Sequence, residues 1–94
     1  MIDPKLLQSI GNLAAREVEA NHPGLNIRFL ALNTDAQMKV AITFKGDKSG
    51  RTVRLFDLQP LGEVDQTAVK AISDNLTQQL EAAVQAFSEM WNRA

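Results

Sequence analysis

Catalysis and metal binding at neutral pH need particular side chains, and this chain of 94 residues offers few of them. It has one histidine, His22, and neither cysteine nor tyrosine. The lack of cysteine excludes disulfides, thiolate metal sites and cysteine nucleophiles. His22 stands in Asn-His-Pro-Gly (21–24), a turn sequence in which a lone histidine usually caps helix carbonyls or faces water. A metal site would need further ligands besides scattered carboxylates, so neither a metal nor a cofactor is predicted.

Motifs for covalent or phosphate chemistry are also missing. The serines do not lie in a Gly-x-Ser-x-Gly elbow, and the glycines form neither a dinucleotide-binding fingerprint nor a phosphate-binding loop. Nothing singles out a catalytic pair of carboxylates. The sequence therefore predicts a protein that is not an enzyme.

Charge is unevenly distributed, although the net charge is only −1. Residues 39–56 carry a net charge of +4 and residues 57–94 carry −4. The cations of the first segment are Lys39, Lys45, Lys48, Arg51 and Arg54. They admit three interpretations: a solvated sheet face, a surface that pairs with acidic residues of another copy or a partner, or a phosphate-binding ribbon.

These side chains must be positioned by a small number of elements. A helix is predicted over about residues 4–20, with Asp3 as N-cap and Pro4 at its first position. The turn sequence 21–24 ends this helix. The apolar residues recur at helical spacing: Leu6, Leu7, Ile10, Leu13, Ala14 and Val18.

Three strands are predicted next, over residues 26–32, 37–45 and 51–58, joined by short turns at 33–36 and 46–50. The middle run alternates most clearly, with Met38, Val40, Ile42 and Phe44 on one face. Alternation would place Lys39, Lys45 and Arg54 on the other face, with Arg28 beside them. Because short loops cannot make parallel crossovers, an antiparallel meander is expected.

A second, longer helix is predicted from an N-cap at Asp65 to about Asn92. Its apolar stripe includes Val69, Ile72, Leu76, Leu80, Ala83, Phe87 and Met90, with Val84 and Trp91 beside it. About 28 residues make a rod of roughly 42 Å. A sheet with strands of about five residues extends only roughly 17–20 Å, so the helix should overhang it. Phe87, Met90 and Trp91 would then form an interface at the overhanging end.

The fold expected is a single α+β domain over residues 1–94, ordered helix–strand–strand–strand–helix. A three-stranded antiparallel meander packs against two helices, the C-terminal one long. The predicted core comprises Leu6, Ile10, Leu13, Ile27, Phe29, Val40, Ile42, Phe44, Val53, Leu55, Val69, Ile72, Leu76 and Leu80.

This order of elements is similar to that of double-stranded-RNA-binding domains. Those domains carry a basic cluster at the start of the second helix, where residues 65–70 of this chain hold one lysine. Small dimeric nucleoid-associated proteins and chaperones of type III secretion effectors have related layouts, the latter with additional strands. The likeness lies in topology alone, and topology does not fix function.

The function predicted is a non-enzymatic protein–protein interaction module: an adaptor, small chaperone or inhibitor. It would form a homodimer through the long C-terminal helix and bind a further, unidentified protein, using Phe87, Met90 and Trp91. The alternative is a nucleic-acid-binding protein that uses the basic hairpin 39–56. The chain has neither a secretory signal at its start nor a long uncharged apolar run, so a cytoplasmic location without membrane contact is expected.

Overall fold

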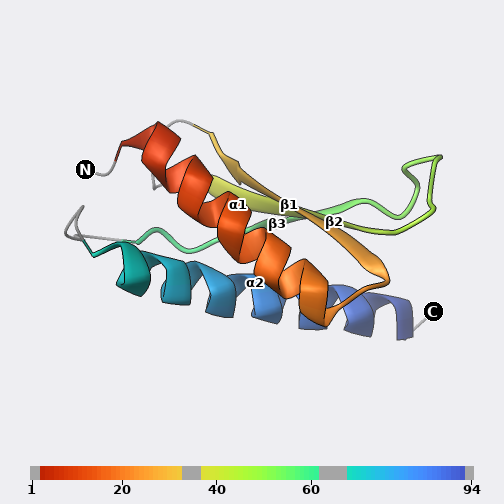
Figure 1. Cartoon of the computed structure of the whole chain (residues 1–94). Helices are drawn as coiled ribbons and strands as arrows, with labels where there is room; N and C mark the ends of the chain where they lie inside the picture. The colour runs from red at the N-terminus through yellow and green to blue at the C-terminus, as the bar shows by residue number, and fades with distance from the viewer. Residues whose placement is uncertain (1–2, 33–36, 62–67, 93–94) are drawn as a thin grey trace.

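Two helices and three strands make up the protein, as seen in a computed structural model that describes residues 3–32, 37–61 and 68–92 (Figure 1). The elements, in order, are α1 (Pro4–Asn21), β1 (Leu25–Ala31), β2 (Met38–Phe44), β3 (Arg54–Asp57) and α2 (Val69–Asn92). The strands form an antiparallel sheet in the order β1-β2-β3. The predicted α+β fold with a helix, a meander and a long C-terminal helix is confirmed.

The ends of α1 follow from local chemistry. Asp3 accepts a hydrogen bond from the main-chain N–H of Lys5 at 2.9 Å, and Pro4 occupies the first turn, where its missing N–H has no cost. At the other end, the N–H of His22 donates to the carbonyl of Glu19 at 3.0 Å. The predicted span of this helix is confirmed to within one residue.

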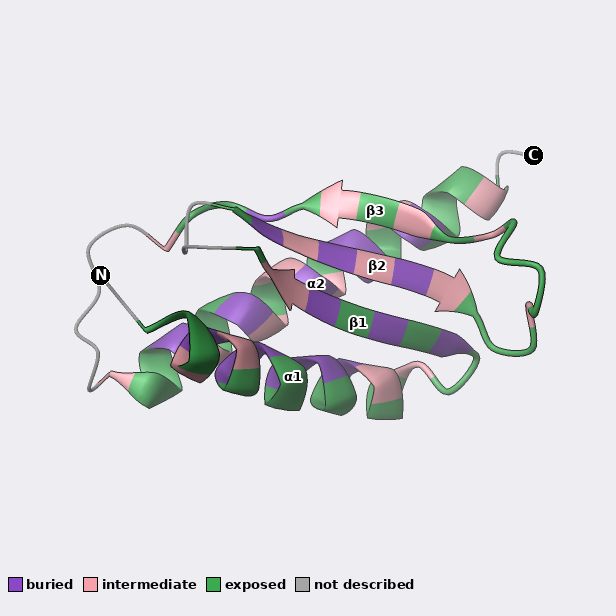
Figure 2. Ribbon diagram, turned by 90° about the horizontal axis from the view of Figure 1, so that it is seen from above, coloured by how far each residue is buried: buried purple, intermediate pink, exposed green. Residues whose placement is uncertain are grey.

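The core lies between the sheet and the two helices. Figure 2 shows α1 running alongside β1 and α2 passing beneath the sheet, while no described helix covers the upper face. Fully buried side chains from all three parts meet there, the largest being Phe29, Phe87, Leu7, Met38, Ile42, Ile72, Leu76 and Leu80. The alternating pattern predicted for residues 37–45 is confirmed, because Met38, Val40 and Ile42 all point into this core.

Five predicted core residues are instead substantially exposed: Leu13, Phe44, Val53, Leu55 and Val69. Leu13 is turned away because α1 packs through its small residues, Gly11, Ala14 and Ala15, which are buried. A helix that approaches closely through small residues buries a narrower stripe than the sequence pattern indicates.

The prediction that Phe87 lies on an exposed, overhanging end of α2 is wrong. α2 has 24 residues, and β1 and β2 have seven residues each, so the sheet extends further along the helix than the five-residue estimate allowed. Phe44 at the end of β2 packs on Phe87, which is fully buried. The predicted N-cap, Asp65, lies outside the described residues.

The face assignment predicted for β3 is also wrong. Ile42 pairs with Arg54 and Val40 pairs with Phe56, so Arg54 and Phe56 lie on the face that packs on the helices. Leu55 therefore lies on the opposite, open face, together with Ala41, its partner on β2. A shift of one residue exchanges the two faces of a strand, which is why every side chain of β3 is reversed relative to the prediction.

Candidate protein-binding surface

An aromatic cluster closes one end of the core. The ring centroids of Phe44 and Phe87 are 5.0 Å apart, and Trp91 lies 5.5 Å from Phe44 and 6.0 Å from Phe87. The guanidinium of Arg54 stands 5.2 Å from the centroid of the Trp91 ring. This distance is within the range of a cation–π interaction, so β3 and the end of α2 are joined through these two side chains.

The three residues predicted to bind a partner occupy different environments. Phe87 is fully buried within the chain's own core, and Trp91 is half-buried against it. Met90 remains exposed over 44% of its surface. Among the three predicted residues, the apolar surface left exposed therefore comes from Met90 and the open part of Trp91.

The five cations predicted to form one ribbon are separated by the reversal of β3. Lys39 lies on the open face and pairs with Asp57 at 2.8 Å, across β2 and β3. Arg54 lies on the helix-covered face, where it stacks on Trp91 and donates to the carbonyl of Val53 at 2.8 Å. These two cations are thus engaged within the chain.

The other three cations, Lys45, Lys48 and Arg51, gather in the loop between β2 and β3. All are exposed, and no carboxylate in the described part of the chain lies within ion-pair distance of them. Asp47 shapes this loop: its carboxylate accepts hydrogen bonds from the backbone and side-chain groups of Ser49 and Thr52. These bonds, that from the Ser49 hydroxyl first and those from Thr52 next, lower the pKa of Asp47 well below its usual range.

His22 serves as a link between the helices. Its Nε2 lies 2.8 Å from a carboxylate oxygen of Glu81, so the end of α1 is connected to the middle of α2. Among the described residues, no group of three or more histidine and carboxylate side chains is placed to hold a metal ion. Neither of the described helices combines the length and apolarity that crossing a membrane would require.

The outer edge of β1 is sealed by α1. The main-chain bonds from Lys45 to Gly24 and from Leu32 to Gln37 fix the hydrogen-bonded pairs between β1 and β2. By alternation, the backbone groups of Ile27, Phe29 and Ala31 point away from β2. An edge of this kind is a template for pairing with another chain unless something occupies it.

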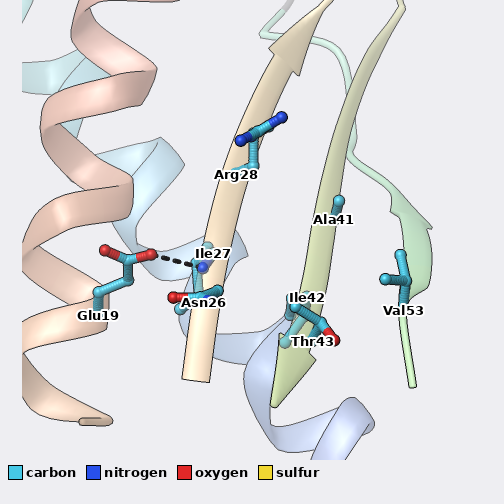
Figure 3. A pocket seen from close by; sticks show the side chains of 8 residues that line it. All are labelled: Glu19, Asn26, Ile27, Arg28, Ala41, Ile42, Thr43 and Val53. Atoms are coloured by element: carbon cyan, nitrogen blue, oxygen red, sulfur yellow. Dashed lines mark hydrogen bonds between the residues drawn. The ribbon is translucent and has the colours of Figure 1, made fainter. Parts of the chain in front are cut away.

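Two side chains of α1 occupy that edge. Glu19 accepts a hydrogen bond from the N–H of Ile27 at 2.6 Å, a contact visible in Figure 3. Gln8 uses both ends of its amide: its nitrogen donates to the carbonyl of Phe29 at 2.8 Å, and its oxygen accepts from the N–H of Ala31 at 2.9 Å. The helix thus takes the place of a fourth strand along β1.

The outer edge of β3 has no partner strand in the part of the chain that the structure describes. The bond from the N–H of Leu58 to the carbonyl of Met38 fixes the hydrogen-bonded pairs of this ladder, and the backbone groups of Leu55 and Asp57 consequently point away from β2. Within residues 3–32, 37–61 and 68–92, no hydrogen bond reaches these outward groups. The side chain of Leu55 is 61% exposed, which adds apolar surface to the open edge.

A shallow hollow of about 440 Å³ lies on the open face of the sheet beside this edge. Figure 3 shows that it crosses the sheet from Arg28 on β1 over Ala41 on β2 to Val53, which precedes β3. Its ionisable lining consists of Arg28 and Glu19, and Glu19 is already bonded to β1. The hollow therefore continues across the open face of the sheet from β1 to the residue that precedes β3.

Sequence reasoning missed this surface because it placed Val53 and Leu55 in the core. The opposite charges of Lys39 and Asp57, which are directly paired across β2 and β3, are a sequence signal that could have fixed the register.

In comparisons with known proteins, no family model, curated protein or solved structure matches this chain.

Proposed function

We propose that this protein is a non-enzymatic protein-binding module, an adaptor, small chaperone or inhibitor, that receives an extended polypeptide segment along β3. The observation that carries the proposal is the difference between the two sheet edges. The β1 edge is occupied by Gln8 and Glu19, whereas Leu55 on β3 presents outward backbone groups beside an exposed side chain. Strand addition uses this combination, backbone bonds for affinity and side chains for specificity.

The surroundings of β3 support this use. Val53 and Leu55 give the open face an apolar border, and the hollow next to them can accept side chains of an added strand. On the helix side, the last turns of α2 project beyond β3 in the view of Figure 2. A strand added to β3 would lie above these turns, where Met90 and Trp91 offer partly exposed apolar surface.

Site-specific photo-crosslinking tests the proposal. A photoreactive amino acid replaces Leu55 in one variant and Leu13, an equally exposed leucine on α1, in a matched control, and both are expressed in the cells that make the protein. We expect a discrete adduct from position 55 and none from position 13. The binding of the purified adduct partner should then weaken at least about tenfold in Leu55→Lys and remain unchanged in Leu13→Lys.

If Leu55→Lys and Leu13→Lys change the binding affinity equally, or if both positions give an adduct, β3 is not the binding edge. Leu55→Lys is suited to the test because its N–H takes no part in the β2–β3 ladder and its side chain is already in water. A charged residue on an edge strand opposes pairing without removing core contacts.

A second candidate function is nucleic-acid binding by the loop between β2 and β3. The observation in its favour is the exposed group of Lys45, Lys48 and Arg51, which lacks ion-pair partners in the described part of the chain. Fluorescence anisotropy with labelled duplex DNA, single-stranded DNA and RNA tests it at low and high salt. Micromolar binding that collapses with salt and is lost in a Lys48→Glu, Arg51→Glu variant would establish phosphate contacts.

A further inference from the structure

We infer that the segment received by β3 is the β3 strand of a second copy of this chain. The two strands would pair antiparallel about a twofold axis at Leu55 and join two three-stranded sheets into one sheet of six strands. This inference rests on the proposed function and names its partner. It is carried by charge complementarity along the strand and by the register that the charges permit.

The charges along β3 and its preceding loop run from positive to negative. Arg51 and Arg54 come first, and Asp57 comes last. Arg51 lies in the turn before β3, so antiparallel pairing brings the turn that carries Arg51 in each copy towards Asp57 at the end of β3 in the other, within the reach of a long side chain. The Asp57 side chain is 83% exposed while it pairs with Lys39, so it has room for a second cation.

The same charges select the register. An axis at Leu55 sets the two copies of Leu55 directly opposite, each donating its outward N–H to the other's outward carbonyl. An axis at Arg54 or at Asp57 would set like charges opposite each other, which is destabilising. An axis at Phe56 would set Asp57 against Leu55 and lose the apolar contact.

The pairing at Leu55 also uses both faces of the combined sheet. On the open face, the two exposed copies of Leu55 cover each other, and this removes apolar surface from water. On the helix side, Arg54 of one copy stands opposite Phe56 of the other. Each guanidinium would then lie close to two aromatic rings: Trp91 of its own copy and Phe56 of the other. The pairing therefore adds apolar contact on the open face and an aromatic neighbour for each guanidinium on the helix side.

Charge reversal with complementation tests the inference by sedimentation velocity across the micromolar range. The unaltered protein should form dimers. Arg51→Glu and Asp57→Lys should each weaken dimerisation at least about tenfold, because each variant creates two repulsive contacts per dimer. An equimolar mixture of the two variants should recover dimers, since every cross-copy contact is attractive again. Lys45→Glu, a charge reversal elsewhere in the same loop, is the matched control and should leave the dimer intact.

Two results would overturn self-pairing. One is that the unaltered, folded protein remains a monomer at every concentration. In that case, a crosslinked adduct between position 55 and a different protein would still support the proposed function. The other is a dimer that neither reversal weakens and that the mixture does not restore, which would place the dimer interface elsewhere. Circular dichroism of each variant separates a loss of pairing from a loss of folding.

Discussion

Gly11 of α1 lies directly against the ring of Phe29 on β1. A Cβ atom added to this glycine would stand 2.1 Å from a ring carbon of Phe29, far inside van der Waals contact. The ring is almost completely buried and has no room to withdraw. The close approach of the helix to the strand is what brings Gln8 and Glu19 within hydrogen-bonding distance of the β1 backbone.

The first prediction follows from this contact. Gly11→Ala should lower the free energy of unfolding by about 1–3 kcal/mol, because overpacking outweighs the gain in helix propensity. Gly24→Ala is the control, since a Cβ at Gly24 meets no atom within 4 Å. Urea denaturation measures both variants. Equal stabilities for the two variants would show that α1 and β1 can separate freely.

The second prediction concerns the sealed edge. Gln8→Ala removes the hydrogen bonds to Phe29 and Ala31, so the free energy of unfolding should fall by about 1–3 kcal/mol. Hydrogen exchange should report the loss locally, with faster exchange of the Ala31 amide. Gln85→Ala is the matched control, because Gln85 is exposed on α2. An Ala31 amide that exchanges at the same rate in both variants would contradict the role assigned to Gln8.

The third prediction concerns Arg54 and Trp91. Arg54→Ala should lower the free energy of unfolding by about 0.5–1 kcal/mol through loss of the cation–π contact. Trp91 is the single tryptophan, so its fluorescence reports the site without interference, and its emission should shift to longer wavelength as water gains access. Lys45→Ala, which alters a cation in the neighbouring loop, should leave the emission unchanged. A spectrum unaffected by Arg54→Ala would rule out the stacked geometry.

The fourth prediction is a pH dependence. Hydrogen bonds from Ser49 and Thr52 hold the pKa of Asp47 below its ordinary value of 3.8, so the folded loop binds a proton less readily than the unfolded chain. The stabilisation is therefore fully present above about pH 4 and is lost as pH falls through the lowered pKa. Carboxyl NMR should show Asp47 titrating below 3.8. A titration of Asp47 at or above 3.8 would contradict the hydrogen-bonded loop.

The fold was largely predictable because three of its elements carry unambiguous patterns. α1 has an Asp–Pro start, β2 alternates strictly and α2 has a long apolar stripe. β3 was not predictable in the same way. Val53 and Leu55 are apolar in one phase, and Phe56 and Leu58 are apolar in the other, so alternation alone allows both registers. Tertiary contacts decide between them: Leu58 is buried and Arg54 stacks on Trp91.

The candidate surface was less predictable than the fold. Pattern analysis identifies apolar and charged residues, but it does not show which of them are used inside the chain. Phe87 belongs to the core and Lys39 pairs with Asp57, and both outcomes depend on contacts between elements distant in sequence. The outward N–H and carbonyl groups of Leu55 cannot be recognised from the residue type, because every residue except proline carries both groups.

The seal on β1 determines how large an assembly of this protein can grow. A sheet with two open edges can add molecules without end and form fibres. In the described part of this chain, the β3 edge has no partner strand, and the opposite edge is covered by the amide of Gln8 and the carboxylate of Glu19. When two molecules join at β3, both ends of the combined sheet are β1 strands. Under the proposed self-pairing, assembly through the sheet would therefore end at two copies, because α1 covers the remaining edge of each molecule.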